Sequence, residues 1–131
     1  TGKTVADALL AVHKSYLKPI RELRKTVAIR GLAHITGGGL VDNVPRILPK
    51  GVTAVFDRAT WKVPALFEFM QKAGRVDRDE MYRVFNMGVG MVVFVRPADT
   101  LKALKALRTA GEKPWVIGNV LKGQVPVKLV N

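Results

Sequence analysis

The sequence predicts an α+β fold, a single domain in which a mixed β-sheet is flanked by helices. Segments with helical periodicity and segments with strand-like character follow one another without a regular alternation, which favours α+β packing over a repeated unit. The chain has 131 residues, of which 48% are hydrophobic and 24% are charged, so it is long enough and apolar enough for one core. We therefore interpret residues 1–131 as one domain without an internal linker.

The first half of the chain predicts five elements, each from its hydrophobic periodicity and from the residues that start or end it. They are a helix over 4–12 with Thr4 as its cap, a helix over 19–27 opened by Pro19, a strand over 28–35, a short helix over 40–48 interrupted at Pro45, and a strand over 51–56. Proline is tolerated in the first turn of a helix and breaks or kinks it further along, which accounts for both proline positions.

The second half predicts six more elements. They are a helix around Leu66–Ala73 stopped by Gly74, a short helix over Asp77–Tyr82 with Asp77 as cap and Glu80 completing a capping box, a central strand over 87–95, a helix from Pro97 to Gly111, and strands over 115–121 and 125–130. In the helix after Pro97, Leu101, Leu104 and Leu107 are expected to line one buried face. The 87–121 portion is then a β-α-β unit, which predicts a partly ferredoxin-like topology.

The composition of the chain excludes several kinds of catalytic and binding site. The absence of cysteine excludes disulfides, a thiol nucleophile and cysteine metal ligands, and it agrees with a cytoplasmic location. No stretch approaches the roughly 18 apolar residues of a membrane span, so no membrane partner is expected. The 22 Lys and Arg outnumber the 10 Asp and Glu, giving a net charge of +12 that attracts polyanions. Much of the excess forms a basic run early in the chain, although such runs are usually solvated helix faces: Lys14, Lys18, Arg21, Arg24, Lys25 and Arg30.

A glycine-rich turn forms the first candidate site. His34-Ile35-Thr36 ends a predicted strand and runs into Gly37-Gly38-Gly39, which precedes a predicted helix. Glycines let a backbone approach a ligand closely, and amides at a helix start attract anions. We interpret Thr36, Gly37, Gly38 and Gly39 as a phosphate-binding turn, with a plain flexible turn as the alternative.

Polar side chains adjoin this turn. Asn43 and Arg46 lie in the first turns of the predicted helix, from which both could reach the same anion, or they could be a helix cap and a surface arginine. His34 is included among the candidate ligand contacts, although a lone histidine is more often structural.

The second candidate segment runs from Glu80 to Met91. Asn86 stands where the chain enters a predicted buried strand, and Gly88 and Gly90 are expected on one face of that strand. Glycines weaken a strand, so something is expected to pack against this backbone, either a ligand or a crossing helix.

The sequence identifies no catalytic group. Ser15 and His13 are too close along the chain to indicate a catalytic pair, and two histidines without a third ligand predict no metal site. Gly2-Lys3-Thr4 is similar to the end of a P-loop but lacks the earlier glycine, and a helix start explains it.

Two segments together resemble one family. HITGGGLVDNVPRILP (34–49) and EMYRVFNMGVGM (80–91) resemble the signature segments in the C-terminal domain of aminoimidazole ribonucleotide synthetase, also called phosphoribosylformylglycinamidine cyclo-ligase. Trp61, Pro64 and Phe67 between them, and Gly118 after them, agree in spacing. One departure is Val12-His13, where many members have Pro-Thr.

The resemblance implies a function for the whole chain. Members of the family use ATP to activate the formyl amide oxygen of formylglycinamidine ribonucleotide, and attack by the amidine nitrogen then closes the imidazole ring of a purine precursor. It implies that ATP and Mg²⁺ are bound mainly by an N-terminal domain absent from this sequence, that the complete enzyme is a homodimer, and that this domain alone is inactive. Thr36, Gly37, Gly38 and Gly39 would hold a phosphate of the substrate, with Asn43, Asn86, Gly88 and Gly90 beside it.

Two alternatives stay open. Selenophosphate synthetase, thiamine-phosphate kinase and the amidotransferase-type synthetase of the preceding purine step are ATP-dependent relatives whose corresponding segments differ from these two. A basic nucleic-acid-binding domain is the alternative outside enzymes. Nucleic acid is the less expected partner, because the aromatic residues are not interleaved with the basic run.

Overall fold

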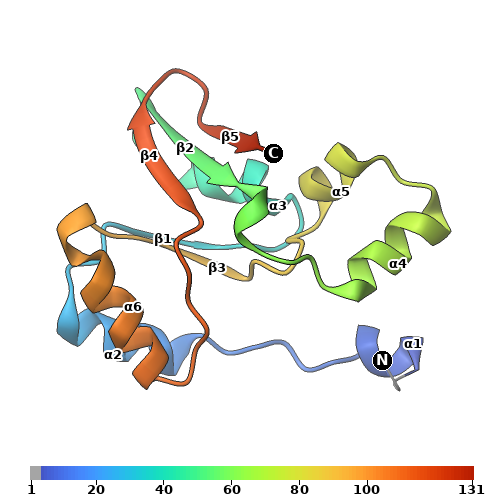
Figure 1. Cartoon of the computed structure of the whole chain (residues 1–131), viewed down its shortest axis with the longest axis horizontal. Coiled ribbons are helices and arrows are strands. Elements are labelled where there is room, and N and C mark those ends of the chain that lie inside the picture. Colours follow the sequence, from blue (N-terminus) through green and yellow to red (C-terminus); the bar gives the residue numbers. More distant parts are fainter. Residues whose placement is uncertain (1–3) are drawn as a thin grey trace.

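The computed structural model describes residues 4–131, which form six helices and five strands connected by short turns (Figure 1). The helices are α1 (Val5–Leu9), α2 (Leu17–Thr26), α3 (Gly39–Asn43), α4 (Ala65–Gly74), α5 (Arg78–Val84) and α6 (Thr100–Thr109). The strands are β1 (Gly31–His34), β2 (Val52–Asp57), β3 (Met91–Phe94), β4 (Gly118–Lys122) and β5 (Val127–Val130). Short 3-10 turns occupy Val44–Arg46, Arg58–Thr60 and Pro97–Asp99.

The strands form two sheets. β1 pairs antiparallel with β3, and β2 lies between β4, to which it is antiparallel, and β5, to which it is parallel. The α+β class with a mixed sheet is therefore confirmed. The expected β-α-β unit over 87–121 is realised differently, because α6 connects strands of two different sheets. Gly118 explains the pairing of β4, since any side chain there would collide with the carbonyl of Val55 on β2.

The strand expected over 87–95 is shorter than its apolar run. Met87 (φ 49°) and Gly88 (φ 94°) have left-handed backbones that form a turn, and β3 begins at Met91. The expectation that Gly88 and Gly90 share one face of a central strand is therefore wrong. Among the described residues β3 pairs on one side only, with β1, so it is not central either.

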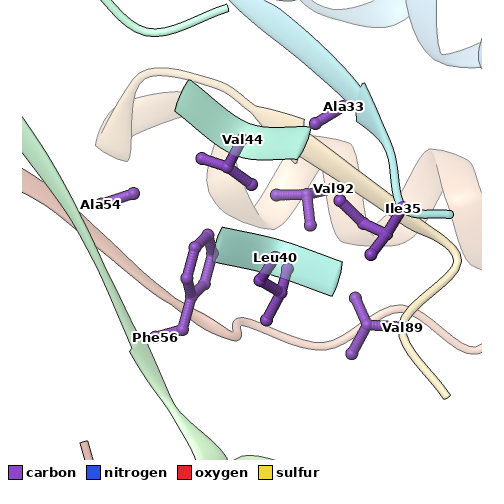
Figure 2. Packing of buried hydrophobic residues seen from close by; sticks show 8 residues of the cluster. All are labelled: Ala33, Ile35, Leu40, Val44, Ala54, Phe56, Val89 and Val92. Atoms are coloured by element: carbon purple, nitrogen blue, oxygen red, sulfur yellow. The ribbon is translucent and has the colours of Figure 1, made fainter. Parts of the chain in front are cut away.

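The main core lies between the two sheets (Figure 2). Its buried residues come from β1 and the residue after it, α3 and its 3-10 continuation, β2, and the β3 region: Ala33, Ile35, Leu40, Val44, Ala54, Phe56, Val89 and Val92. Phe56 and Val44 are almost completely buried, and the short helix α3 is held between the sheets by Leu40. Both ends of the glycine-rich turn are thus anchored in this core through Ile35 and Leu40.

A second core joins α2 to α6. Leu23 of α2 and Val27, the residue directly after that helix, pack on Ala103 of α6, and Val93 of β3 packs against them. Leu107 packs against this core as expected, but Leu101, expected on the same face, is 81% exposed, and Ala103 is the buried residue of the helix. Gly111 (φ 89°) ends the helix region as the sequence predicts.

Helix ends largely follow the sequence signals. Thr4 caps α1 in a complete capping box with Asp7, and the hydrogen bond from the Thr4 hydroxyl holds the pKa of that carboxyl below its ordinary value. Asp77 caps α5, but the Glu80 side chain pairs with Arg83 instead of completing a capping box. Gly74 was expected to stop α4 from outside, yet it is the last helical residue and Arg75 (φ 51°) takes the left-handed position.

The N-terminal arm stands apart from the body. α1 buries no residue, and it ends at Leu9, earlier than the helix expected over 4–12 (Figure 1). The P-loop-like residues Gly2 and Lys3 lie outside the described part of the chain. Within residues 4–131, no helix has the length and apolar character required to cross a bilayer.

Candidate functional site

The two segments singled out in the sequence lie directly against each other. α3, which follows the glycine turn, packs on α5, which opens the second segment. The amide of Gly38 donates a hydrogen bond to the carbonyl of Val84 at 3.1 Å. The amide of Ile35 donates to the carbonyl of Gly90 at 2.9 Å, which fastens the start of the turn to the second segment as well. Segments about 45 residues apart in sequence therefore form one structural unit.

The three glycines of the turn have different surroundings. Gly39 (φ 55°) presses so closely on the carbonyls of Tyr82 and Phe85 that no side chain fits. A Cβ on Gly38 (φ 93°) would lie 2.7 Å from the Cβ of Asp42. Gly37 faces open space and has no positive φ. Two of the glycines are therefore required by packing and by backbone geometry, and Gly37 alone has room for a ligand beside it.

The amides of the turn are partly used by the protein itself. Gly39 donates to the carbonyl of Thr36 at 3.1 Å, and Gly38 donates to Val84. Neither amide is free for an anion in this arrangement, which differs from the anion-binding mode that the sequence suggests. The exposed positions of the turn are Thr36 and Gly37.

Asn43 holds the turn together from inside. It is 5% exposed, and its amide nitrogen donates to the carbonyls of Gly39 at 2.8 Å and Gly37 at 3.1 Å. A buried amide with these bonds fixes the path of the backbone. Arg46 is exposed at the end of the 3-10 turn after α3, and within residues 4–131 it makes no hydrogen bond to the glycine turn.

In the second segment, Asn86 shapes a tight turn. Its side-chain oxygen accepts from the amide of Gly88 at 3.0 Å, and the indole nitrogen of Trp61 donates to the carbonyl of Met87 at 3.1 Å. A Cβ on Gly88 would lie 2.6 Å from Pro64, so this glycine accommodates the proline. Of the two alternatives weighed for these glycines, close packing of the protein accounts for Gly88.

His34 lies against two aromatic side chains that the sequence did not indicate as its neighbours. Its ring centroid lies 5.1 Å from that of His13 and 6.0 Å from that of Tyr16, both in the segment between α1 and α2. Tyr16 also covers Gly90, where a Cβ would collide with the phenol oxygen. No spacing rule could have found this group, because 21 residues separate the two histidines and an irregular segment brings them together.

A cavity of about 360 Å³ opens beside this group. Its wall includes Gly88 and Gly90 together with the polar and aromatic side chains of Lys14, Tyr16, Lys113 and Trp115. Lys14 forms an ion pair with Glu112 across the cavity wall. The candidate ligand-facing residues therefore fall into two groups: His34, Thr36 and Gly37, which are exposed at the turn, and Tyr16, Gly88 and Gly90, which line the cavity.

The site holds no evident nucleophile or metal ligand set. Over residues 4–131, no group of three or more His, Cys, Asp or Glu side chains lies close enough to hold a metal ion. Arg83 lowers the pKa of Glu80 through a hydrogen bond at 2.7 Å, but this pair lies on the exposed side of α5. What the arrangement offers is positioning through backbone, hydroxyl, imidazole and cationic groups.

Comparison with known proteins places this geometry in a family. Residues 1–130 match the family described as AIR synthase related protein, C-terminal domain. The fold is similar to two crystal structures of E. coli HypE, a hydrogenase maturation protein, at TM-scores of 0.67 and sequence identities of 18% and 20%. The matches cover 98% and 90% of this chain but only 42% and 37% of the HypE chains, so the chain spans about two fifths of those structures. The chain belongs to the family of AIR synthase related proteins, as their C-terminal domain.

Proposed function

We propose that this chain is the C-terminal domain of phosphoribosylformylglycinamidine cyclo-ligase and supplies the substrate-binding wall of its active site. An ATP-binding N-terminal domain would complete the enzyme, contribute most contacts to ATP and Mg²⁺, and form most of the homodimer interface. The length of the matched structures, of which this chain spans about two fifths, supports a second domain.

The observation that carries the proposal is the convergence of the two signature segments. Gly38 and Gly39 of the first segment contact Val84, Tyr82 and Phe85 of the second. The intervening residues take part too, since Trp61 bonds the Met87 carbonyl, Pro64 packs on Gly88, and the rings of Phe67 and Phe85 are 5.9 Å apart. The two segments and the residues between them that share the resemblance therefore occupy one region of the fold.

The chemistry suits such a region. Activation of an amide oxygen by phosphoryl transfer from ATP depends on positioning and charge neutralisation more than on a protein nucleophile. We assign contact with the phosphorylated substrate to Thr36 and Gly37, with His34 and the Tyr16-lined wall beside them. Asn43, Gly38 and Gly39 are assigned the role of holding this turn in shape.

The deciding experiment pairs the chain with an ATP-binding domain. This chain and the N-terminal domain of an established cyclo-ligase are co-expressed, and ATP-dependent conversion of formylglycinamidine ribonucleotide to the imidazole product is measured. We expect activity in the pair and none in either part. A well-folded, stable complex without activity on this substrate would contradict the assignment to the cyclo-ligase, while membership in the broader family would stand.

A second experiment isolates the role of the turn. In the active pair, Gly37→Val places a side chain in open space, so the domain folds and the substrate KM rises about tenfold or more. Thr36→Ala should also raise KM, because the hydroxyl of this exposed residue, which donates to the Asn43 side chain at 3.5 Å, is lost. Gly38→Val is unsuitable, since its strained backbone and the nearby Asp42 would confound ligand loss with misfolding. Unchanged kinetics in Gly37→Val would contradict the binding role.

A further inference from the structure

Two basic stretches that are far apart in the sequence form one surface. α2 exposes Lys18, Arg21, Arg24 and Lys25, and α6 exposes Lys102, Lys105 and Arg108. We call these seven residues the α2–α6 basic face. In the sequence only the first run stands out, and it has the character of an ordinary solvated helix face.

The packing of the two helices turns all seven cations outward. Leu23 of α2 contacts Ala103 of α6 in the second core, so the polar sides of both helices are left on the outside. Figure 1 shows α2 and α6 side by side, at the end of the molecule away from α4 and α5. The face shares no residue with the candidate site.

The positive charge of this face is poorly compensated. Glu22 is the single acidic residue within the two helices, and it pairs with Lys25 at 2.8 Å. Among the described residues, the other six cations form no ion pair. Six uncompensated charges on one surface create a positive potential that attracts a polyanion.

The chemistry of the face selects one polyanion. Helices of 10 residues are about 15 Å long and pack with axes about 8–10 Å apart, so the face can span several phosphates of a duplex. Neither helix contains Phe, Trp or Tyr, so the face lacks the stacking platforms that hold single strands and the aromatic anchors common at membrane surfaces.

We propose that the α2–α6 basic face binds the phosphate backbone of double-stranded nucleic acid without sequence preference. The contacts are charge-assisted hydrogen bonds from lysine and arginine to phosphate oxygens, which carry no base information. This surface is independent of the cyclo-ligase assignment, and either can fail alone.

The test compares two variants of equal net charge. The face variant carries Lys18→Gln, Arg21→Gln, Lys105→Gln and Arg108→Gln. The control carries Lys50→Gln, Lys62→Gln, Lys72→Gln and Lys128→Gln, four exposed lysines elsewhere on the molecule. Fluorescence anisotropy with labelled 20-base-pair DNA and RNA duplexes of two unrelated sequences gives the affinity over a salt series, and circular dichroism checks the fold of each variant.

We expect the natural chain to bind all duplexes alike, with log K falling against log salt at a slope of about −5, as phosphate contacts from the six uncompensated cations require. The face variant should lose about tenfold or more in affinity at low salt, and the control less than about threefold. Equal losses in both variants, or no binding by the natural chain, would overturn the proposal. So would binding to anionic vesicles or polyglutamate that matches duplex binding and is lost in the face variant.

Discussion

Gly39 lies at a close contact between the two signature segments. Its backbone is left-handed, and the carbonyls of Tyr82 and Phe85 fill the space that a side chain would need. Gly37, two residues earlier, has neither constraint. Neighbouring glycines in one motif thus serve different purposes, which only the structure separates.

Gly39→Ala should lower the free energy of unfolding by about 2–4 kcal/mol, because a strained backbone adds to a steric collision with carbonyl oxygens that cannot move freely. Urea unfolding followed by tryptophan fluorescence measures the loss. Gly37→Ala is the matched control and should stay within about 0.5 kcal/mol. Equal midpoints for the two variants would show that α5 can shift away from the turn.

The buried amide of Asn43 offers a test that depends on pH. Asn43→Asp replaces a donor to the carbonyls of Gly37 and Gly39 with a carboxylate, whose burial and facing oxygens raise its pKa in the folded state. The variant therefore keeps its stability while the carboxyl is protonated and loses it as pH rises. The loss in free energy of unfolding relative to the natural chain should be smaller near pH 4 than at pH 7. Asn43→Ala should show a deficit of about 1–3 kcal/mol at both pH values. If the stability loss of Asn43→Asp were the same at both pH values, the role of the Asn43 amide as a hydrogen-bond donor would be contradicted.

At the scale of elements, caps matter only where the helix they start is anchored. Asp77 accepts from the amide of Asp79 at 2.8 Å at the start of α5, which buries Met81 and Tyr82. Thr4 caps α1 with similar geometry, but α1 buries nothing. The same local chemistry is thus coupled to the global fold in one helix and uncoupled in the other.

Asp77→Ala should cost about 1 kcal/mol of global stability, the usual loss for a helix cap. Thr4→Ala should leave the unfolding midpoint unchanged, since α1 can unwind without exposing core. Paired thermal melts of the two variants measure the difference. A shift in Thr4→Ala as large as that in Asp77→Ala would indicate that α1 packs on the body.

Local sequence signals were sufficient to predict whether most segments are helices or strands, and to predict where several helices begin or end. The roles of Thr4 and Asp77 as helix caps and of Gly111 at a helix end depend only on neighbouring residues in the sequence, so they could be predicted without tertiary information. The buried side of α6 could not, because Leu101 fits a helical stripe as well as Ala103 does, and only the position of α2 decides between them. Arg75 takes a left-handed backbone that the adjacent Gly74 was expected to serve.

For the whole molecule, the N-terminal arm marks the limit of the stable unit. Val12 is 96% exposed, whereas Tyr16 covers Gly90 and contacts His34. The boundary between a free arm and an anchored segment therefore lies between these residues.

Removal of residues 1–12 should change the melting temperature by less than about 2 °C, because residues 4–12 contribute nothing to the hydrophobic cores. Removal of residues 1–16 should lower it by about 5 °C or more, because the cover of Gly90 and the Lys14–Glu112 ion pair disappear together. Calorimetry of the two truncated chains provides the comparison. Equal melting temperatures would mean that Tyr16 contributes nothing to the body.

The arrangement of strands and the site depended on contacts that the sequence does not display. β4 pairs with β2 and not with β3, and Gly118 lies there against the Val55 carbonyl; the sequence shows neither contact, so the division into two sheets could not be predicted. The residues of the glycine turn could be identified, because three consecutive glycines are conspicuous, but the use of their amides by Val84 and Thr36 could not. His13 and Tyr16 joined the site only through the path of an irregular segment.

The close contact at Gly39 also bears on how such chains diverge. Because the glycine is demanded by the carbonyls of a neighbouring helix, purifying selection for folding alone preserves it, whether or not the protein still turns over a substrate. A copy that had lost catalysis after gene duplication would keep the glycines that packing requires, Gly38 and Gly39. Sequence searches with the glycine-rich motif should therefore retrieve inactive paralogues together with enzymes. Substitutions at Thr36 and Gly37 should distinguish the inactive paralogues from the enzymes.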